Sequence, residues 1–541
     1  MQLRFNFGLL LILCCFQIAA KDSLDNLIKQ QKNADESTLR AHKLEKKDVY
    51  SNAQRNAFTL GDLPQEKNCF IINRVELEDN FLGEQLISEV QKAIAGRCVG
   101  SAGVQKIAAA LQDYYINAGY ITTRISIPSQ DISKGKLRFL VNAGKIEKTI
   151  VEGNDISEWM LPFQRNDILN IRDIEQGLEN LQRVPDVDVK INIEPGTRDG
   201  YSNVHIDTHR GKNWSVRASY NNWGDEETGR YQTTAVGYLF NPAKMGDLFY
   251  LAVTRSTTGQ YENVSSYYSI PVGYWEYGFF YSKSKSQQVI PLSYISLDYV
   301  GTSEYLSAKA TRTVYRDKTK KFAGSAELIR RKSNYTLNGE ELTLQARDMG
   351  NIKLGLNYKQ QLPGAFWDST LSWQRFLTWF GGEKTPDMQY GDVSPVSNIF
   401  NFEGNYTRQI KNGYFNTAFF AQYAPRELTL QDQITVGDRW SIRGFENSVG
   451  LSGNDGFYIK NTLAFPLPGM KANYYAGLDF GQVYQDASYG DESLMGAAVG
   501  IDGNIKSLEY NFSVSTPLKY PATLDIDRVN VNFNFSYQSK G

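Results

Sequence analysis

The chain has 541 residues, which is too long for one ordinary domain and predicts several. Its 58 basic and 59 acidic residues leave a formal net charge of −1, which argues against a nucleic-acid-binding protein held by bulk charge. No run of about 18 apolar residues follows the N-terminus, which excludes a membrane protein built from helices. Only 3 His residues are present, so a histidine-rich metal enzyme is not expected.

Residues 1–20 have the pattern of a secretory signal peptide. Arg4 places a positive charge before the apolar run at 9–13, and small residues end the segment. Such a segment is removed on export and is too short to span a membrane with its flanks. Cys14 would suggest a lipoprotein signal, but the large Leu13 precedes it where a small residue is expected. We therefore expect an exported chain without a lipid anchor.

Two cysteines, Cys69 and Cys98, remain after the signal peptide. In an oxidising compartment, such a pair favours one disulfide. The bridge would close a loop of about 30 residues and add roughly 3 kcal/mol to stability. Two free thiols are the alternative.

The next two zones are polar. Residues 21–48 contain no Gly or Pro and carry a narrow apolar stripe through Leu24, Leu27 and Ile28. This pattern predicts a solvated helix with little surface to bury. Residues 49–66 have no clear period and are predicted to be a linker.

Residues 67–145 and 146–210 predict two compact units with one repeated order, strand, helix, helix, strand, strand. In the first unit, the expected elements are 69–75, 84–94, 104–118, 121–127 and 136–141. In the second unit, they are 146–151, 155–163, 172–183, 187–193 and 203–208.

Helical periodicity ends near residue 212, and ten-residue segments with one apolar and one polar face follow. Val531, Phe533, Phe535 and Tyr537, for example, alternate with polar residues. Strands of this length and pattern indicate a transmembrane β-barrel, which must close because lipid satisfies no backbone group. A soluble β-sandwich is the alternative. Residues 211–541 are therefore predicted to form a barrel of 16 antiparallel strands: 212–222, 229–240, 247–256, 263–271, 274–285, 304–314, 321–333, 350–361, 366–377, 397–409, 414–424, 456–466, 472–483, 494–502, 505–515 and 530–538.

Motifs for catalysis are absent from the sequence. No HExxH, GxSxG, Walker or GxGxxG pattern occurs. His205 and His209 share one face of a predicted strand, but a metal would need further ligands, and none is indicated. We therefore expect no enzyme, no cofactor and no metal site.

One long loop, predicted at 425–455, carries the segment 437–445 with Arg443. In the strand at 472–483, alternation directs Asp479 into the lumen, and neighbouring glycines leave room for an incoming side chain. An arginine carried inward by the loop could pair with Asp479 at two points. Charges in a lumen more often meet only water, so the pattern by itself leaves this pairing open.

These residues carry a family resemblance. Ile442-Arg443-Gly444-Phe445, which follows Ser441, and Asp479-Phe480-Gly481 resemble the two hallmark motifs of two-partner secretion transporters, outer-membrane barrels related to the barrel-assembly machinery. The tandem units resemble polypeptide-transport-associated (POTRA) domains in the fragments 115–124 and 172–183. Two such units, rather than about five, distinguish the chain from the general assembly factor. One departure is that the chain continues past Tyr537, where these barrels usually end on an aromatic residue.

The resemblance implies a Gram-negative outer-membrane translocase with its POTRA domains in the periplasm. Residues 21–48 would be a plug helix inside the barrel. Arg443 and Asp479 would hold the loop, with Ser441, Ile442, Gly444, Phe445, Phe480 and Gly481 in support. The implied partners are a large secreted exoprotein (adhesin, cytolysin or contact-dependent inhibition toxin), outer-membrane lipid, and the barrel-assembly machinery for insertion, with no nucleic acid. Transport would proceed without ATP.

Two alternatives stay open. A passive solute channel would make the loop an ordinary constriction, although such a pore needs no periplasmic peptide-binding units. A membrane hydrolase in a barrel would need a Ser–His pair facing lipid, and the barrel offers none because the three His residues all precede residue 212.

Overall fold

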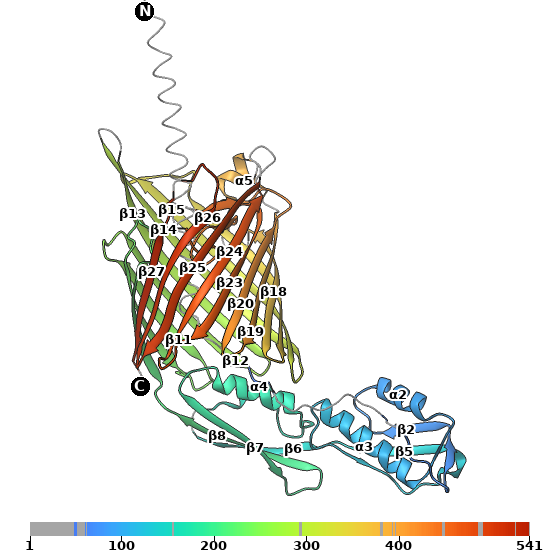
Figure 1. Ribbon diagram of the computed structural model, residues 1–541. Helices are drawn as coiled ribbons and strands as arrows, with labels where there is room; N and C mark the ends of the chain where they lie inside the picture. Colours follow the sequence, from blue (N-terminus) through green and yellow to red (C-terminus); the bar gives the residue numbers. More distant parts are fainter. Residues whose placement is uncertain are drawn as a thin grey trace, which may run out of the picture.

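The computed structural model describes residues 48–50, 60, 62–153, 156–291, 295–378, 382–391, 393–394, 397–445, 450–484, 491–524 and 526–539. These residues form two small α+β units and a barrel (Figure 1). The second unit lies directly against one rim of the barrel, and the first lies beyond it. The predicted signal peptide, the predicted plug helix up to residue 47 and most of the predicted linker lie outside the described residues.

The first unit has two sheets and two helices. Its elements are β1 (Phe70–Ile72), β2 (Arg74–Glu78), α2 (Glu84–Ile94), β3 (Arg97–Val99), α3 (Ser101–Asn117), β4 (Arg124–Ser126), η1 (Ile132–Lys134) and β5 (Lys136–Asn142). β5 lies between β2 and β4, parallel to β2 and antiparallel to β4, while β1 pairs with β3. Leu86, Val90 and Ile94 recur at helical spacing and bury one face of α2 in the core.

The predicted single strand at 69–75 is wrong, because the chain changes partners at Asn73. β1 pairs with β3, whereas β2 pairs with β5, and the backbone N–H of Asn73 donates to Gly135 instead. β3, which was not predicted, is too short for alternation to mark it.

The predicted disulfide is present between Cys69, next to β1, and Cys98 in β3, which are 29 residues apart. A double change, Cys69→Ser with Cys98→Ser, should lower the free energy of unfolding of the first unit by about 3 kcal/mol, because the unfolded loop is no longer constrained. Denaturant-dependent proteolysis of the full chain would measure the change. Reduction of the unaltered protein should reproduce it, and equal unfolding midpoints with and without the bridge would contradict the prediction.

The second unit has one three-stranded sheet and one α-helix, and its last strand is central, as in the three-stranded sheet of the first unit. Its elements are β6 (Lys145–Glu152), η2 (Glu158–Met160), α4 (Ile171–Gln182), β7 (Val187–Pro195) and β8 (Tyr201–Arg210). β8 is central, parallel to β6 and antiparallel to β7. The predicted helix at 155–163 is wrong: a single 3-10 turn, η2, is present, and Leu161 is extended. Pro162 explains this end, because a residue before proline is disfavoured in helical backbone.

Sixteen long strands within the described residues close the barrel, as predicted, with β27 paired to β9. A two-residue strand, β16 (Glu340–Glu341), adds only to β15. The long strands are β9 (Trp214–Asn221), β10 (Gln232–Phe240), β11 (Leu248–Ser256), β12 (Tyr261–Val272), β13 (Trp275–Pro291), β14 (Ser296–Arg316), β15 (Lys320–Leu337), β17 (Arg347–Leu362), β18 (Ala365–Leu377), β19 (Asn398–Ile410), β20 (Gly413–Tyr423), β23 (Asp455–Pro466), β24 (Ala472–Tyr484), β25 (Asp491–Ile505), β26 (Leu508–Lys519) and β27 (Asn530–Gln538).

Each predicted barrel strand has its counterpart, and the boundaries differ most in β13, β14 and β15. These three continue well beyond the predicted ends, up to Pro291, back to Ser296 and on to Leu337. Alternation places apolar side chains such as Leu354, Leu356 and Phe512 on the outer surface, where they are exposed. The inner face is therefore the polar one. Among the described residues, no helix is both long enough and apolar enough to cross a membrane.

Two rims bound the barrel. We call the rim that faces the second unit the proximal rim; it carries the turns at 241–247, 273–274 and 317–319. The other is the distal rim, where the short helix α5 (Pro386–Tyr390) lies (Figure 1).

Candidate functional site: a luminal loop and the proximal rim

The loop between β20 and β23 folds inward onto the barrel wall. Its described residues include two short antiparallel strands, β21 (Ile434–Val436) and β22 (Leu451–Gly453). Apolar side chains of the loop, Ile434, Val436, Ile442, Phe445 and Leu451, pack with Val483 and Leu494 of the wall. The loop thus has a small core of its own against β24 and β25.

The structure brings Arg443 and Asp479 together. The guanidinium donates from Nε to Oδ2 of Asp479 at 2.7 Å and from Nη2 to Oδ1 at 2.6 Å. The backbone N–H groups of Arg443 (3.0 Å) and Asn461 (3.1 Å) donate to the same carboxylate. Asp479 is 0% exposed. A buried carboxylate with two guanidinium bonds and two backbone bonds fixes both the position and the orientation of the arginine.

Glycines in the wall make room for this pair. A Cβ built at Gly477 would lie 2.1 Å from Arg443 Nη2, and one at Gly496 would lie 1.8 Å from the Arg443 carbonyl oxygen. At Gly481 a Cβ would lie 2.6 Å from Ile442 Cδ1. Any larger residue at these positions would push the loop away from the wall.

The turn that presents Arg443 is built by its neighbours. Ser441 donates its hydroxyl to the Asp438 carboxylate at 2.7 Å, and its backbone N–H donates to the same group at 2.6 Å. Gly444 has φ +105°, a backbone conformation that favours glycine, and its carbonyl accepts a hydrogen bond from Asn530 at 2.8 Å. Ile442 and Phe445 are buried in the loop core. Phe480, by contrast, packs on Phe457 and not on the loop core.

A second attachment holds the loop nearer the distal rim. Gln431 donates to the Ser333 hydroxyl at 3.0 Å, and Asp432 lies 3.7 Å from Arg331 in an ion pair. Leu430 packs against Tyr299 and Tyr335, which are buried on the extended ends of β14 and β15. The loop is therefore anchored at two places along the barrel axis.

Helix α4 docks on the proximal rim through side chains that an isolated helix would leave in water. Asn180 donates to the carbonyl of Gly273 at 2.7 Å, and Arg183, which follows α4, donates to the carbonyls of Gly246 and Ser269, each at 3.2 Å. These acceptors lie in or beside barrel turns. Since buried polar groups need partners, this polar face requires the barrel for its stability.

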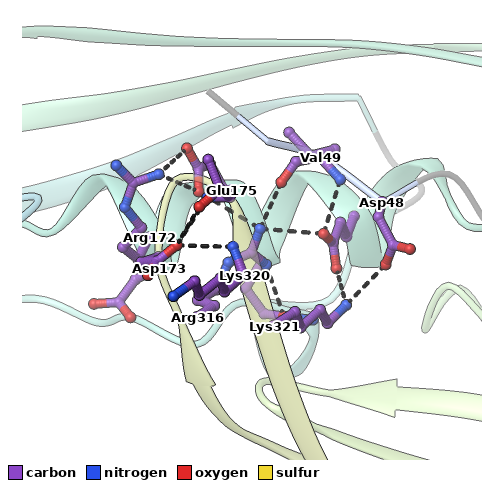
Figure 2. Close-up of polar contacts among 12 residues, drawn as sticks. Asp48, Val49, Arg172, Asp173, Glu175, Arg316, Lys320 and Lys321 are labelled. Atoms are coloured by element: carbon purple, nitrogen blue, oxygen red, sulfur yellow. Dashed lines mark hydrogen bonds and ion pairs between the residues drawn. The ribbon is translucent and has the colours of Figure 1, made fainter. Parts of the chain in front are cut away.

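Arg316, at the end of β14, is the central cation of this contact (Figure 2). Its side chain is 2% exposed and lies 3.1 Å from Glu179 and 3.5 Å from Glu175, both on α4. It also donates to Gln176 at 2.9 Å. Together with α4 and the three turns, Arg316 forms what we call the rim junction.

Residues 48–50, where the predicted plug helix meets the predicted linker, enter the same junction and are not helical. The Asp48 carboxylate lies 3.2 Å from Lys321 Nζ and 2.6 Å from Lys359 Nζ. The backbone of Val49 donates to Glu179 at 2.8 Å and accepts from Arg316 at 2.7 Å. Burial raises the pKa of the Asp48 carboxyl, but the two ammonium groups lower it more, and the pKa lies below its ordinary value.

Sequence reasoning missed the rim junction. Alternation along the strands indicates that Lys321 and Lys359 point into the barrel, and the sequence shows that 172–183 is charged. The sequence does not indicate that these groups contact one another, because the partners lie far apart in the chain; Asp48 and Lys321 are separated by 273 residues. The two predicted-strand histidines, His205 and His209, each lie beside one carboxylate, and the described residues hold no cluster of metal-ligating type.

Comparison with known proteins gives consistent matches. Residues 200–503 match the model of the haemolysin secretion/activation protein ShlB/FhaC/HecB family. Residues 70–144 match the ShlB-type POTRA domain and residues 145–195 a POTRA domain. The chain is 29% identical over 512 residues to the outer membrane transporter CdiB-2 of Burkholderia pseudomallei strain 1026b, covering 88% of this chain and 87% of that protein. It is 26% identical over 495 residues to the hemolysin transporter protein ShlB of Serratia marcescens, covering 88% and 87%.

A solved structure shows the same fold. CdiB from Escherichia coli superposes with a TM-score of 0.82 at 25% identity, covering 95% of this chain and 98% of that one. A closed barrel with a fixed luminal loop and two tandem periplasmic units defines a POTRA-barrel transporter of the bacterial outer membrane. The chain belongs to the haemolysin secretion/activation (ShlB/FhaC/HecB) family of two-partner secretion transporters.

Proposed function

We propose that this transporter recognises one large exoprotein in the periplasm through its POTRA domains and exports it through the barrel as an extended chain. The observation that carries this is the rim junction, which seats the second POTRA domain on the mouth of a lumen whose loop is fixed by Arg443 and Asp479. The relatives are named as transporters of CdiB and haemolysin type. The cargo class we infer is therefore a toxin, cytolysin or adhesin.

The POTRA domains offer sheet edges for such a cargo. β2 and β4 are the outer strands of the first sheet, and β6 and β7 are those of the second. An extended segment can add to an edge strand through backbone hydrogen bonds, which give affinity without strict demands on sequence. This mode suits an unfolded polypeptide, and it needs neither catalysis nor ATP.

The domain division is part of the proposal. Residues 1–20 would be the signal peptide, 21–48 a plug helix, 49–66 the linker, 67–145 and 146–210 the POTRA domains, and 211–541 the barrel. The loop 425–455 with its Arg443–Asp479 pair would act as a lock whose pose export requires. The barrel-assembly machinery would insert the chain into the outer membrane.

Export in a reconstituted host tests the proposal. The chain is expressed with a candidate exoprotein, with and without residues 67–210, and the medium is assayed; heat-modifiable migration in gels checks barrel insertion. We expect deletion to reduce export at least tenfold while the barrel still inserts. A shorter deletion, 67–142, keeps the rim junction and isolates the contribution of the first domain. Equal export without 67–210 would favour a passive channel instead.

A further inference from the structure

We propose that Lys321 and Lys359 form a carboxylate-binding site at the periplasmic mouth of the barrel, filled by Asp48 at rest and taken over by an acidic side chain of the exported polypeptide. The exchange would couple arrival of cargo to release of the 48–50 segment. This inference rests on the proposed function, because it concerns the polypeptide that passes the same mouth.

The two lysines need an anion between them. They are directly opposite each other on β15 and β17, and their side chains are only 14% and 22% exposed. Like charges at opposed positions of paired strands destabilise a sheet. Glu179 lies 2.5 Å from Lys321 and Asp368 lies 3.8 Å from Lys359, but Asp48 alone bridges both lysines among the described residues.

The site does not require Asp48 of this chain in particular. The hydrogen bonds of the following residue, Val49, are made by its backbone, which donates to Glu179 and accepts from Arg316. Any extended segment with an acidic residue at the same place can repeat all four contacts. The ligand class is therefore an extended peptide carrying Asp or Glu.

The resident segment also contains one polar group that the described residues do not pair. The hydroxyl of Tyr50 is buried without a hydrogen-bond partner among the described residues. A buried hydroxyl without a partner weakens binding. A competing segment without such a hydroxyl would therefore bind the site more tightly than residues 48–50 do. A cavity of about 160 Å³ borders the site and is lined by Asp48, Glu179, Lys321 and Lys359 among others, which leaves space for an approaching side chain.

A peptide-binding experiment on the reconstituted full chain tests the site. The probe is a fluorescent peptide with the sequence of residues 45–53, and its partner has Asn in place of Asp48. In an Asp48→Asn chain, whose resident segment is weakened, we expect the Asp peptide to bind about tenfold tighter than in the unaltered chain, the order for one charge-assisted contact. The Asn peptide should bind at least tenfold more weakly than the Asp peptide.

Further variants make the outcome decisive. Adding Lys321→Gln and Lys359→Gln to the Asp48→Asn chain should abolish its preference for the Asp peptide over the Asn peptide. Because these two changes remove a contact between like charges, the barrel should remain folded. Glu304→Gln, which alters an exposed ion pair with Lys283 elsewhere, is the matched control. Equal binding of the two peptides, or unchanged binding after loss of both lysines, would overturn the site.

A displacement experiment tests whether the exported polypeptide competes for the site. A segment of an exoprotein that this chain exports should displace the labelled peptide, and its acid-to-amide version should not. An exported segment that leaves the peptide bound would overturn the exchange. If no exoprotein is exported although the peptide binds as expected, the proposed function fails and the exchange fails with it, whereas the carboxylate site itself stands.

Discussion

Replacing Arg443 by Ala should reduce export of the partner exoprotein at least tenfold while the barrel still inserts. The change leaves the carboxylate of Asp479 buried without its cation. Breaking a buried charge pair in this way costs about 3–5 kcal/mol. Arg443 touches the ladder between β23 and β24 at one residue, where it donates to the Asn461 carbonyl, and the register extends over the whole of both strands. We therefore expect the cost to fall mainly on the position of the loop. Exoprotein in the medium, together with heat-modifiable migration, measures the effect.

Graded variants separate charge from geometry. Arg443→Lys keeps the charge but cannot donate two parallel hydrogen bonds to one carboxylate, so export should be intermediate. Asp479→Ala should match Arg443→Ala. Arg330→Ala removes a more exposed pair with Asp348 and should leave export unchanged. Wild-type export by both Arg443→Ala and Asp479→Ala would refute the lock.

The strand pattern was predictable because the barrel wall separates two very different surroundings. Leu354 and Leu356 face outward, whereas Lys353 lines a cavity inside the barrel. The two-residue alternation of apolar and polar residues in the sequence therefore distinguishes the two faces. The ends of β13, β14 and β15 were underestimated for the same reason. Around Lys283 and Lys285 no apolar face remains, so alternation disappears although pairing continues.

The sequence predicts part of the loop motif but nothing of the rim junction. Alternation alone could direct Asp479 inward, and the glycines beside it marked available space, but only the family resemblance selected Arg443 as its partner. The rim junction had neither signal. A helix such as α4 normally leaves its polar face in water. That Glu175, Glu179 and Asn180 are instead buried follows from tertiary docking, which no local pattern contains.

Loss of Arg316 should loosen the second POTRA domain from the barrel. Arg316→Ala removes the cation that contacts Glu175 and Glu179, together with a hydrogen bond to Val49. Glu175 keeps Arg172 and Glu179 keeps Lys321, so we expect the low end of the cost of breaking a buried pair, about 3 kcal/mol. That corresponds to roughly a 100-fold rise in the undocked population. Hydrogen exchange of the amides in α4 should accelerate accordingly.

A matched arginine on the same strand gives the control. Arg312 lies over the ring of Trp275 and has no ion pair with α4 among the described residues, so Arg312→Ala should leave exchange in α4 unchanged. Export should fall with Arg316→Ala if a seated POTRA domain delivers the cargo to the mouth. Faster exchange with unimpaired export would mean that docking serves stability alone. Unchanged exchange would show that Asn180 and Arg183, which bond the other turns, suffice to hold the domain.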